Sequence, residues 1–247
     1  MFKTVNALVL REVRYKEADR ILTLLTDTDG KITVKARGAL RKSSKTAAAT
    51  QQLIYSEMTL FGNLGRWTVN EAVVKEGFDG LRTDIGSFAL GCYFAECADA
   101  LSVEDQPDAP LMQLALNCLY ALSRGMYAPE HIKAAFELRL MCLAGYTPEL
   151  SHCAVCGEEE PGDPVLMLER GCVCCRRCAA GAGRTVKLDA ASLNAMRHIC
   201  SVPPKQILSF SLEGEGAKRL SAAAEEYLLL HTERRFPTLD YWKNVKI

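Results

Sequence analysis

The segment ILTLLTDTDGKITVKARG, residues 21–38, predicts the element on which the N-terminal fold depends. Two runs rich in apolar and β-branched residues flank the sequence Asp27-Thr28-Asp29-Gly30. Gly30 can adopt the positive φ that a tight turn between two strands requires. The segment is therefore predicted to form a β-hairpin.

Further strand patterns surround this hairpin, at residues 4–13, 51–62 and 65–77. About five short strands without a long helix are typical of a small closed barrel. From about residue 84 the pattern becomes helical, and helices are expected at residues 87–102, 109–125, 129–146, 188–200 and 214–234. The predicted fold class is α+β, with a β-barrel domain at 1–80 and a helical domain at 81–247 that carries a cysteine-rich insertion at about 150–185.

The composition is typical of a globular protein, with 247 residues, 49% of them apolar, and a formal net charge of zero. The N-terminus has no apolar run of the signal-peptide type, and the longest uncharged helical stretch, residues 109–123, is too short to span a bilayer. We therefore expect a cytoplasmic protein with no membrane partner. An odd number of cysteines, eleven, then favours reduced thiols over disulfides.

The zero net charge hides an uneven distribution. Residues 1–50 contain eleven Lys and Arg against five Asp and Glu, so the rest of the chain is acidic. Residues 31–45 contain six cations and no acid: Lys31, Lys35, Arg37, Arg41, Lys42 and Lys45. Such asymmetry indicates a surface that binds a polyanion.

Side chains alternate between the two faces of a strand, so the cations on the second strand of the hairpin should share one face. Ile32, Val34 and Ala36 should face the barrel interior, and Lys31, Thr33, Lys35 and Arg37 the outer face. Arg41, Lys42 and Lys45 would continue the charge into a mobile loop. The alternative is that edge-strand lysines only discourage pairing with other chains. Six cations without an acid favour a nucleic-acid surface, which Arg14, Tyr15, Lys16 and Arg20 could extend more weakly because acids lie among them.

Six of the eleven cysteines are concentrated between residues 153 and 178. Cys153-x-x-Cys156 is followed by a second pair that is either Cys172 with Cys175 or Cys175 with Cys178. Two C-x-x-C units in a Gly- and Pro-rich loop without a hydrophobic core of its own favour a structural zinc ion held by four thiolates. The other five cysteines, Cys92, Cys97, Cys118, Cys142 and Cys200, are interpreted as small buried apolar residues.

Motifs that indicate catalysis are absent from the sequence. It contains no phosphate-binding loop, nucleophile elbow or H-E-x-x-H pattern, and its four histidines are far apart. We expect a protein that is not an enzyme. A zinc-containing protein-interaction adaptor and a metal-dependent nucleic-acid enzyme remain the alternatives.

Several segments resemble the RecO family of bacterial recombination mediators: EADRILTLLTDTDGKITVKARGALRKSSK, AFELRLMCLAGYTPELSHCAVCG, GCVCCRRC and a C-terminal helix, EEYLLLHTERRFPTLDYW. The resemblance implies an N-terminal OB-fold, a helical domain and a zinc-ribbon-like module with four cysteine ligands. It also implies activity without catalysis: binding of single- and double-stranded DNA, annealing of complementary strands, and loading of RecA with RecR onto DNA covered by single-strand-binding protein (SSB).

The same resemblance implies roles for particular residues. Lys35, Arg37, Arg41 and Lys42 match the DNA-binding region of the family, and the charge pattern adds Lys31 and Lys45. The second cysteine pair of the family favours Cys175 and Cys178 alongside Cys153 and Cys156 as zinc ligands. Cys172 and Cys174 depart from the family pattern and leave two possible pairings.

Overall fold

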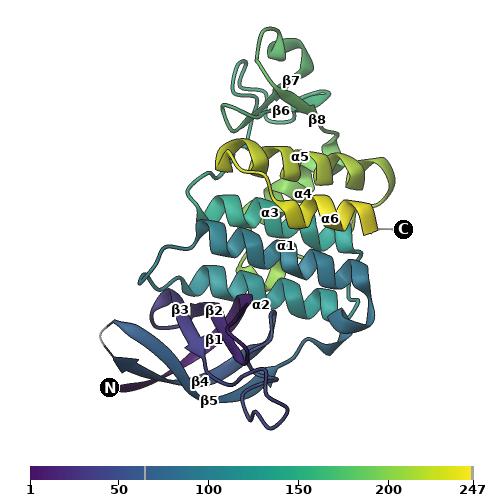
Figure 1. Cartoon of the computed structure of the whole chain (residues 1–247). Helices are drawn as coiled ribbons and strands as arrows, with labels where there is room; N and C mark the ends of the chain where they lie inside the picture. Colours follow the sequence, from purple (N-terminus) through teal and green to yellow (C-terminus); the bar gives the residue numbers. More distant parts are fainter. Residues whose placement is uncertain (64, 246–247) are drawn as a thin grey trace. The chain divides into compact units, whose positions relative to one another are not determined.

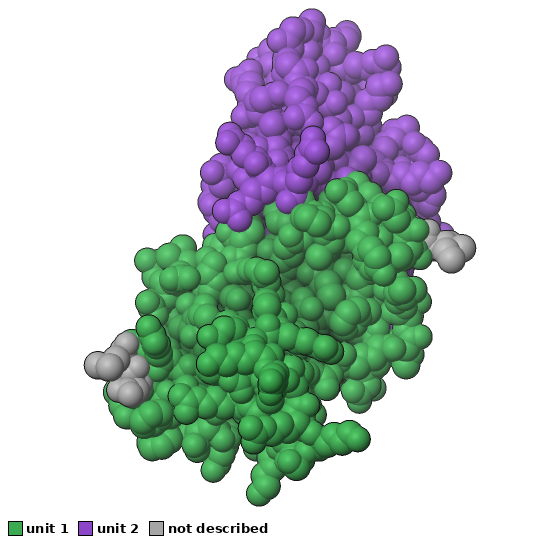
Figure 2. Space-filling view, in the orientation of Figure 1, with its two compact units in different colours: residues 1–124, 236–247 green, residues 125–235 purple. Residues whose placement is uncertain are grey.

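The computed structural model describes residues 1–63 and 65–245 (Figure 1). The chain divides into two compact units, residues 1–124 with 236–247, and residues 125–235 (Figure 2). Among the described residues, no helix has both the length and the apolar character needed to cross a membrane. The two compact units differ from the proposed partition at residue 80, because three helices cluster with the barrel.

The first unit contains the closed β-barrel. Its strands are β1 (Phe2–Tyr15), β2 (Asp19–Thr26), β3 (Gly30–Ala36), β4 (Tyr55–Asn63) and β5 (Arg66–Glu76). They follow the order β1-β2-β3-β5-β4 around the barrel, and β3 and β5 are parallel whereas the other neighbours are antiparallel. This confirms the predicted five-stranded barrel.

The barrel interior is filled by side chains that alternate along its strands: Val5, Ala7, Val9, Leu22, Leu24, Ile32, Val34, Ala36, Ala39, Met58, Leu60 and Val69. The β2–β3 hairpin turns at Gly30, whose φ is +63°. A Cβ at Gly30 would lie 1.9 Å from the backbone oxygen of Gln106, so the turn accepts only glycine.

A short 3₁₀ helix, η1 (Asp79–Thr83), and the helices α1 (Ile85–Leu101), α2 (Ala109–Ser123) and α6 (Pro237–Val245) complete the first unit. Asp84 and Asp108 cap α1 and α2 by accepting backbone N–H bonds from Ser87 and Leu111. The α6 segment is held on α1, where the backbone N–H of Thr238 donates to Glu96 Oε2 at 3.2 Å. The C-terminal residues therefore belong to the same compact unit as the barrel.

The second unit contains α3 (Pro129–Leu143), α4 (Ala190–Ser201) and α5 (Gly214–Thr232). It also contains a small sheet of order β7-β6-β8, from β6 (Pro164–Met167), β7 (Cys172–Cys175) and β8 (Thr185–Lys187), and the 3₁₀ helices η2 (Arg176–Ala179) and η3 (Pro204–Gln206). Figure 1 shows this sheet beyond α5, whose His231 Nε2 lies 3.0 Å from the carbonyl oxygen of Leu168, next to β6.

The prediction of one continuous C-terminal helix over EEYLLLHTERRFPTLDYW is wrong. The helix α5 ends at Thr232, Glu233 adopts a left-handed φ of +51°, and α6 begins at Pro237. Proline lacks the backbone N–H that a helix interior requires and restricts the residue before it, so it starts a helix here instead of continuing one.

Candidate nucleic-acid interface and metal centre

The cationic strand β3 has the predicted alternation. Ile32, Val34 and Ala36 lie in the barrel core, whereas Thr33 and Arg37 are exposed. Lys31 and Lys35 point outward but are only half-exposed, because both contact carboxylates. The six cations of the stretch therefore fall into two groups with different surroundings.

Lys31 and Lys35 are held in place by the first unit itself. Lys31 Nζ donates to the backbone oxygen of Asp99 at 2.7 Å and lies 3.3 Å from Asp99 Oδ1, at the end of α1. Lys35 Nζ lies 2.8 Å from Asp19 Oδ2 and 4.9 Å from the centre of the Tyr15 ring. The hydrogen bonds from Lys35 and from the backbone of Gly38 lower the pKa of Asp19. A phosphate that contacts Lys31 would compete with Asp99.

Arg37, Arg41, Lys42 and Lys45 are all exposed, in the segment that follows β3. Gly38 turns the chain with a φ of +63°, and its backbone N–H donates to Asp19 Oδ1 at 2.8 Å. In the part of the chain that the structure describes, no salt bridge is found for these four cations. They are the cations of the stretch that can reach an outside anion without breaking an internal pair.

The segment after β3, residues 37–53, was predicted to begin as a mobile basic loop. It instead forms a series of turns that hydrogen-bond to the barrel strands. Leu40 N donates to the oxygen of Ala18 and Leu53 N to that of Val9, both at 2.9 Å. The Arg20 guanidinium donates to the oxygen of Ala47 at 2.9 Å and to Thr50 Oγ1 at 3.0 Å. The Ser, Thr and Ala content that resembled a flexible loop instead provides small residues and hydroxyls that close consecutive turns.

The β1–β2 hairpin lies beside these cations, because its Ala18 bonds to Leu40. Arg14 and Lys16 are exposed there, so both are open to an outside anion. Arg20 is not, since its Nε lies 3.3 Å from Glu12 Oε2 and its other nitrogens hold the turns. Sequence reasoning treated the acids among these cations as weakening the surface. Asp19 and Glu12 pair with Lys35 and Arg20, so they reduce the free positive charge and also hold the two side chains in place.

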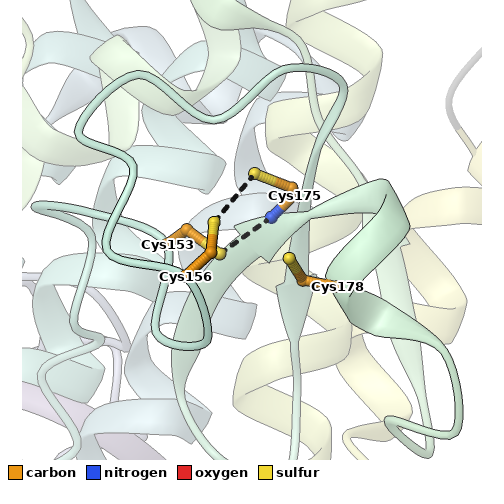
Figure 3. A group of neighbouring side chains, drawn as sticks. All are labelled: Cys153, Cys156, Cys175 and Cys178. Atoms are coloured by element: carbon orange, nitrogen blue, oxygen red, sulfur yellow. Dashed lines mark hydrogen bonds between the residues drawn. The ribbon is translucent and has the colours of Figure 1, made fainter.

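Four cysteines converge in the second unit (Figure 3). The sulfurs of Cys153, Cys156, Cys175 and Cys178 all lie within 4.8 Å of one another. Cys153 and Cys156 come from a turn closed by Gly157, with φ +78°, whereas Cys175 ends β7 and Cys178 lies in η2. Figure 3 shows the four side chains pointing toward one common centre.

The structure brings together one of the two cysteine pairs that the sequence left open. Cys175 with Cys178 forms the second knuckle, and Cys172 lies outside the group of four. Cys172 and Cys174 instead join Val165 and Met167 in a small buried cluster. The expectation that this module has no hydrophobic core of its own is therefore wrong, because thiols serve as apolar residues in it.

The geometry of the cluster fits a metal ion with tetrahedral thiolate coordination. A tetrahedron with metal–sulfur bonds of about 2.3 Å has edges of about 3.8 Å, and Cys156 Sγ lies 3.8 Å from Cys175 Sγ. Burial raises the pKa of Cys153, but backbone N–H groups of Cys156, Cys175 and Val155 aimed at its sulfur lower it to about 6. These hydrogen bonds favour the thiolate form of Cys153, and four protein ligands would complete a tetrahedral shell.

Two family models match the chain, one on each side of residue 80. Residues 1–78 match the family described as recombination protein O N terminal, and residues 82–240 match recombination protein O C terminal. The chain belongs to the recombination protein O, or RecO, family. RecO is a family of DNA repair proteins, in agreement with the resemblance drawn from the sequence motifs.

Curated RecO relatives match almost the full length of the chain. The DNA repair protein RecO of Acetivibrio thermocellus is 30% identical over 240 residues, which cover 97% of this chain and 96% of that protein. The RecO of Symbiobacterium thermophilum is 30% identical over 240 residues, covering 96% and 95%. The RecO of Heliobacterium modesticaldum is 33% identical over 236 residues, covering 92% and 84%.

Proposed function

We propose that this RecO protein binds single- and double-stranded DNA through the exposed cations at one end of its barrel and anneals complementary strands without catalysing a bond change. The proposal extends to loading of RecA, together with RecR, onto DNA covered by SSB, in the cytoplasm at the nucleoid. The barrel domain at 1–80 would carry the DNA contacts. Membership of a DNA repair family supports this function.

The observation that carries the proposal is the exposure of Arg37, Arg41, Lys42 and Lys45 on a segment fixed to the barrel. Two DNA strands repel each other along their phosphates. Cations held at fixed positions release condensed counterions on binding and lower this repulsion, so both strands can stay close enough to pair. Base pairing and stacking then supply the free energy of annealing. Lys35 and Lys31 would contribute less, because each already contacts a carboxylate.

The four-cysteine cluster supports a structural role for Zn²⁺. Cys153, Cys156, Cys175 and Cys178 would hold the ion, which would cross-link the turn before β6 to the end of β7. Four protein thiolates leave no coordination position for a substrate, which argues against a metal-dependent nucleic-acid enzyme. The module would therefore stabilise the second unit.

A triple charge reversal, Arg37→Glu/Arg41→Glu/Lys42→Glu, tests the proposal. We expect weaker binding to DNA of any sequence. The slope of log affinity against log salt should become shallower by about one unit for each phosphate that is no longer neutralised. The matched control, Lys187→Glu/Lys205→Glu/Arg234→Glu, reverses three exposed charges in the other unit. Normal annealing by the triple variant would refute the proposed surface. A protein-interaction adaptor would bind its partners but show no salt-sensitive affinity for DNA.

A further inference from the structure

An exposed aromatic pair lies on the outer face of the barrel. Phe2 on β1 and Phe61 on β4 are directly paired across the two strands, and their ring centres are 5.1 Å apart at an interplanar angle of 50°. Phe2 is 60% exposed and Phe61 39% exposed. Aromatic rings that are open to solvent on a barrel need a reason, since burial of the same rings elsewhere would stabilise the fold.

Strand pairing connects these rings to the cationic strand. Phe61 is paired with Thr68 on β5, and Thr68 with Lys35 on β3. Phe2, Phe61, Thr68 and Lys35 thus form one row across the outer face of β1, β4, β5 and β3. Neighbouring strands are about 4.8 Å apart, so the row is about 14 Å long. It leads from the aromatic pair to the end of β3, where Arg37 begins the exposed cations.

The row itself contains no acidic residue, whereas charges of both signs lie beside it on the outer face. Arg66 is exposed and lies two residues before Thr68 on β5, so it shares the outer face. Glu71 lies on the same outer face in the next row, where it is paired with Thr59 and Thr59 with Thr4. The row itself carries no acid, since Thr68 is the residue between Phe61 and Lys35.

The aromatic pair rests on a rigid base. On the inner side, the Trp67 ring packs so closely on Gly62 that a Cβ at this glycine would lie 2.5 Å from it. Lys3 Nζ lies 3.8 Å from the centre of the Trp67 ring and 2.6 Å from Asp29 Oδ1. The backbone on both sides of the Phe2–Phe61 pair is therefore fixed before any ligand binds, which lowers the entropic cost of binding.

We infer that Phe2 and Phe61 form a base-stacking platform for single-stranded nucleic acid, whose phosphates continue along Thr68 to Lys35 and Arg37. Single-stranded bases expose their faces and can stack on aromatic rings regardless of sequence, whereas bases in a duplex are already stacked on each other. The platform would therefore distinguish single strands from duplex, which the cations alone cannot do. This inference rests on the proposed DNA binding.

The test measures affinities of the full chain for three probes of equal length: a mixed-sequence single strand, an abasic single strand and a duplex. For Phe2→Ala/Phe61→Ala we expect about 5-fold to 100-fold weaker binding to the mixed-sequence strand. Binding to the abasic strand and the duplex should be unchanged, as should the salt slope. Phe61→Tyr should retain affinity because it keeps the ring. Val73→Ala, at a residue 65% exposed on β5, is the control and should bind normally.

Several outcomes would overturn the inference. The first is that the unmodified chain binds the mixed-sequence and abasic strands with equal affinity. The second is that the double variant loses affinity equally for all three probes, because the rings would then support the barrel and not the bases. Self-association that the double variant abolishes, with unchanged DNA binding, would assign the aromatic pair to a contact between two copies. These results would leave the proposed function standing. If the unmodified chain bound none of the three probes, both the inference and the proposed function would be refuted.

Discussion

Lys35 Nζ lies 2.8 Å from Asp19 Oδ2, and the same carboxylate accepts the backbone N–H of Gly38. Asp19 therefore fixes the strand end at which the exposed cations begin, while it neutralises one of them. The side chain that positions the basic surface also limits its charge.

Replacing this carboxylate should strengthen DNA binding. In Asp19→Asn the amide oxygen can still accept the Gly38 N–H, but the charge that opposes Lys35 is gone. We expect tighter binding, with a salt slope steeper by about one unit because Lys35 becomes available to a phosphate. Titration of a labelled oligonucleotide at several salt concentrations measures this. The matched control, Asp99→Asn, removes the carboxylate near Lys31 at the other end of β3 and should have a smaller effect, because Lys31 keeps its hydrogen bond to the backbone oxygen of residue 99. Weaker binding by Asp19→Asn would contradict the prediction.

A buried charged group in the second unit should dominate its stability. Lys133 Nζ lies 2.8 Å from Glu137 Oε1 and 2.9 Å from Glu225 Oε2, and thus links α3 to α5. Burial lowers the pKa of Lys133, but the two carboxylates raise it above its usual value. Lys133→Met leaves buried carboxylates without this cation and should lower the free energy of unfolding by about 3–5 kcal/mol.

Urea denaturation followed by circular dichroism measures this loss. Lys218→Met removes a lysine that is 80% exposed on α5 and should change stability by less than about 0.5 kcal/mol. Equal stability of the two variants would show that the buried ion pairs contribute nothing.

Metal content should distinguish ligand cysteines from core cysteines. Cys178→Ala and Cys156→Ala should lose bound zinc, because each removes one of four ligands. Cys172→Ala should retain it, since Cys172 lies outside the group of four converging cysteines. Metal analysis of the purified variants decides between the two pairings: loss of zinc from Cys172→Ala with retention by Cys178→Ala would assign the other pairing, whereas Cys156→Ala should lose zinc in either case.

Removal of the metal should also expose the module to proteases. A chelator is expected to increase cleavage between residues 150 and 185, because the metal cross-links segments with a very small core. Binding of DNA to the barrel should persist under the same conditions. Loss of DNA binding with the metal would mean that the module contributes to the interface.

Cys142 should be the most reactive thiol outside the metal centre. The sequence suggested that Cys142 and Cys200 are buried, but both are half-exposed. A hydrogen bond from the Cys200 thiol, a second from Thr147 and the nearby Arg139 guanidinium lower the pKa of Cys142 to about 7, against the effect of burial. Its thiolate fraction, and with it the rate of alkylation, should therefore rise as pH increases through about 7.

Iodoacetamide labelling across the range from mildly acidic to mildly alkaline pH, quantified for each peptide by mass spectrometry, measures that rate. Cys200→Ser should keep part of the hydrogen bond, whereas Cys200→Ala removes it and should move the midpoint for Cys142 to higher pH. A midpoint at the ordinary thiol pKa, about 8.5, in the unmodified chain would disprove the lowered pKa.

Local patterns were sufficient for much of the fold. The hairpin at 21–38, the strands beside it and most helices were predictable because alternation, helical periodicity, turn residues and caps act over a few residues. The break between α5 and α6 also has a local signal, Pro237. The apolar residues on both sides of this proline nevertheless made the segment resemble one helix. The first C-x-x-C unit could be recognised for the same reason, because its two cysteines are close together in the sequence.

The sequence by itself determined which elements form, that cations gather after the second hairpin strand, and that the thiols between 153 and 178 can bind a metal. Only the tertiary structure decided which cations are free, which of two cysteine pairs completes the cluster, and that Phe2 lies in one row with Lys35. These facts depend on strand pairing and on contacts between residues far apart along the chain. Residue spacing along the sequence does not predict these contacts, because they form only when the barrel closes and its turns pack.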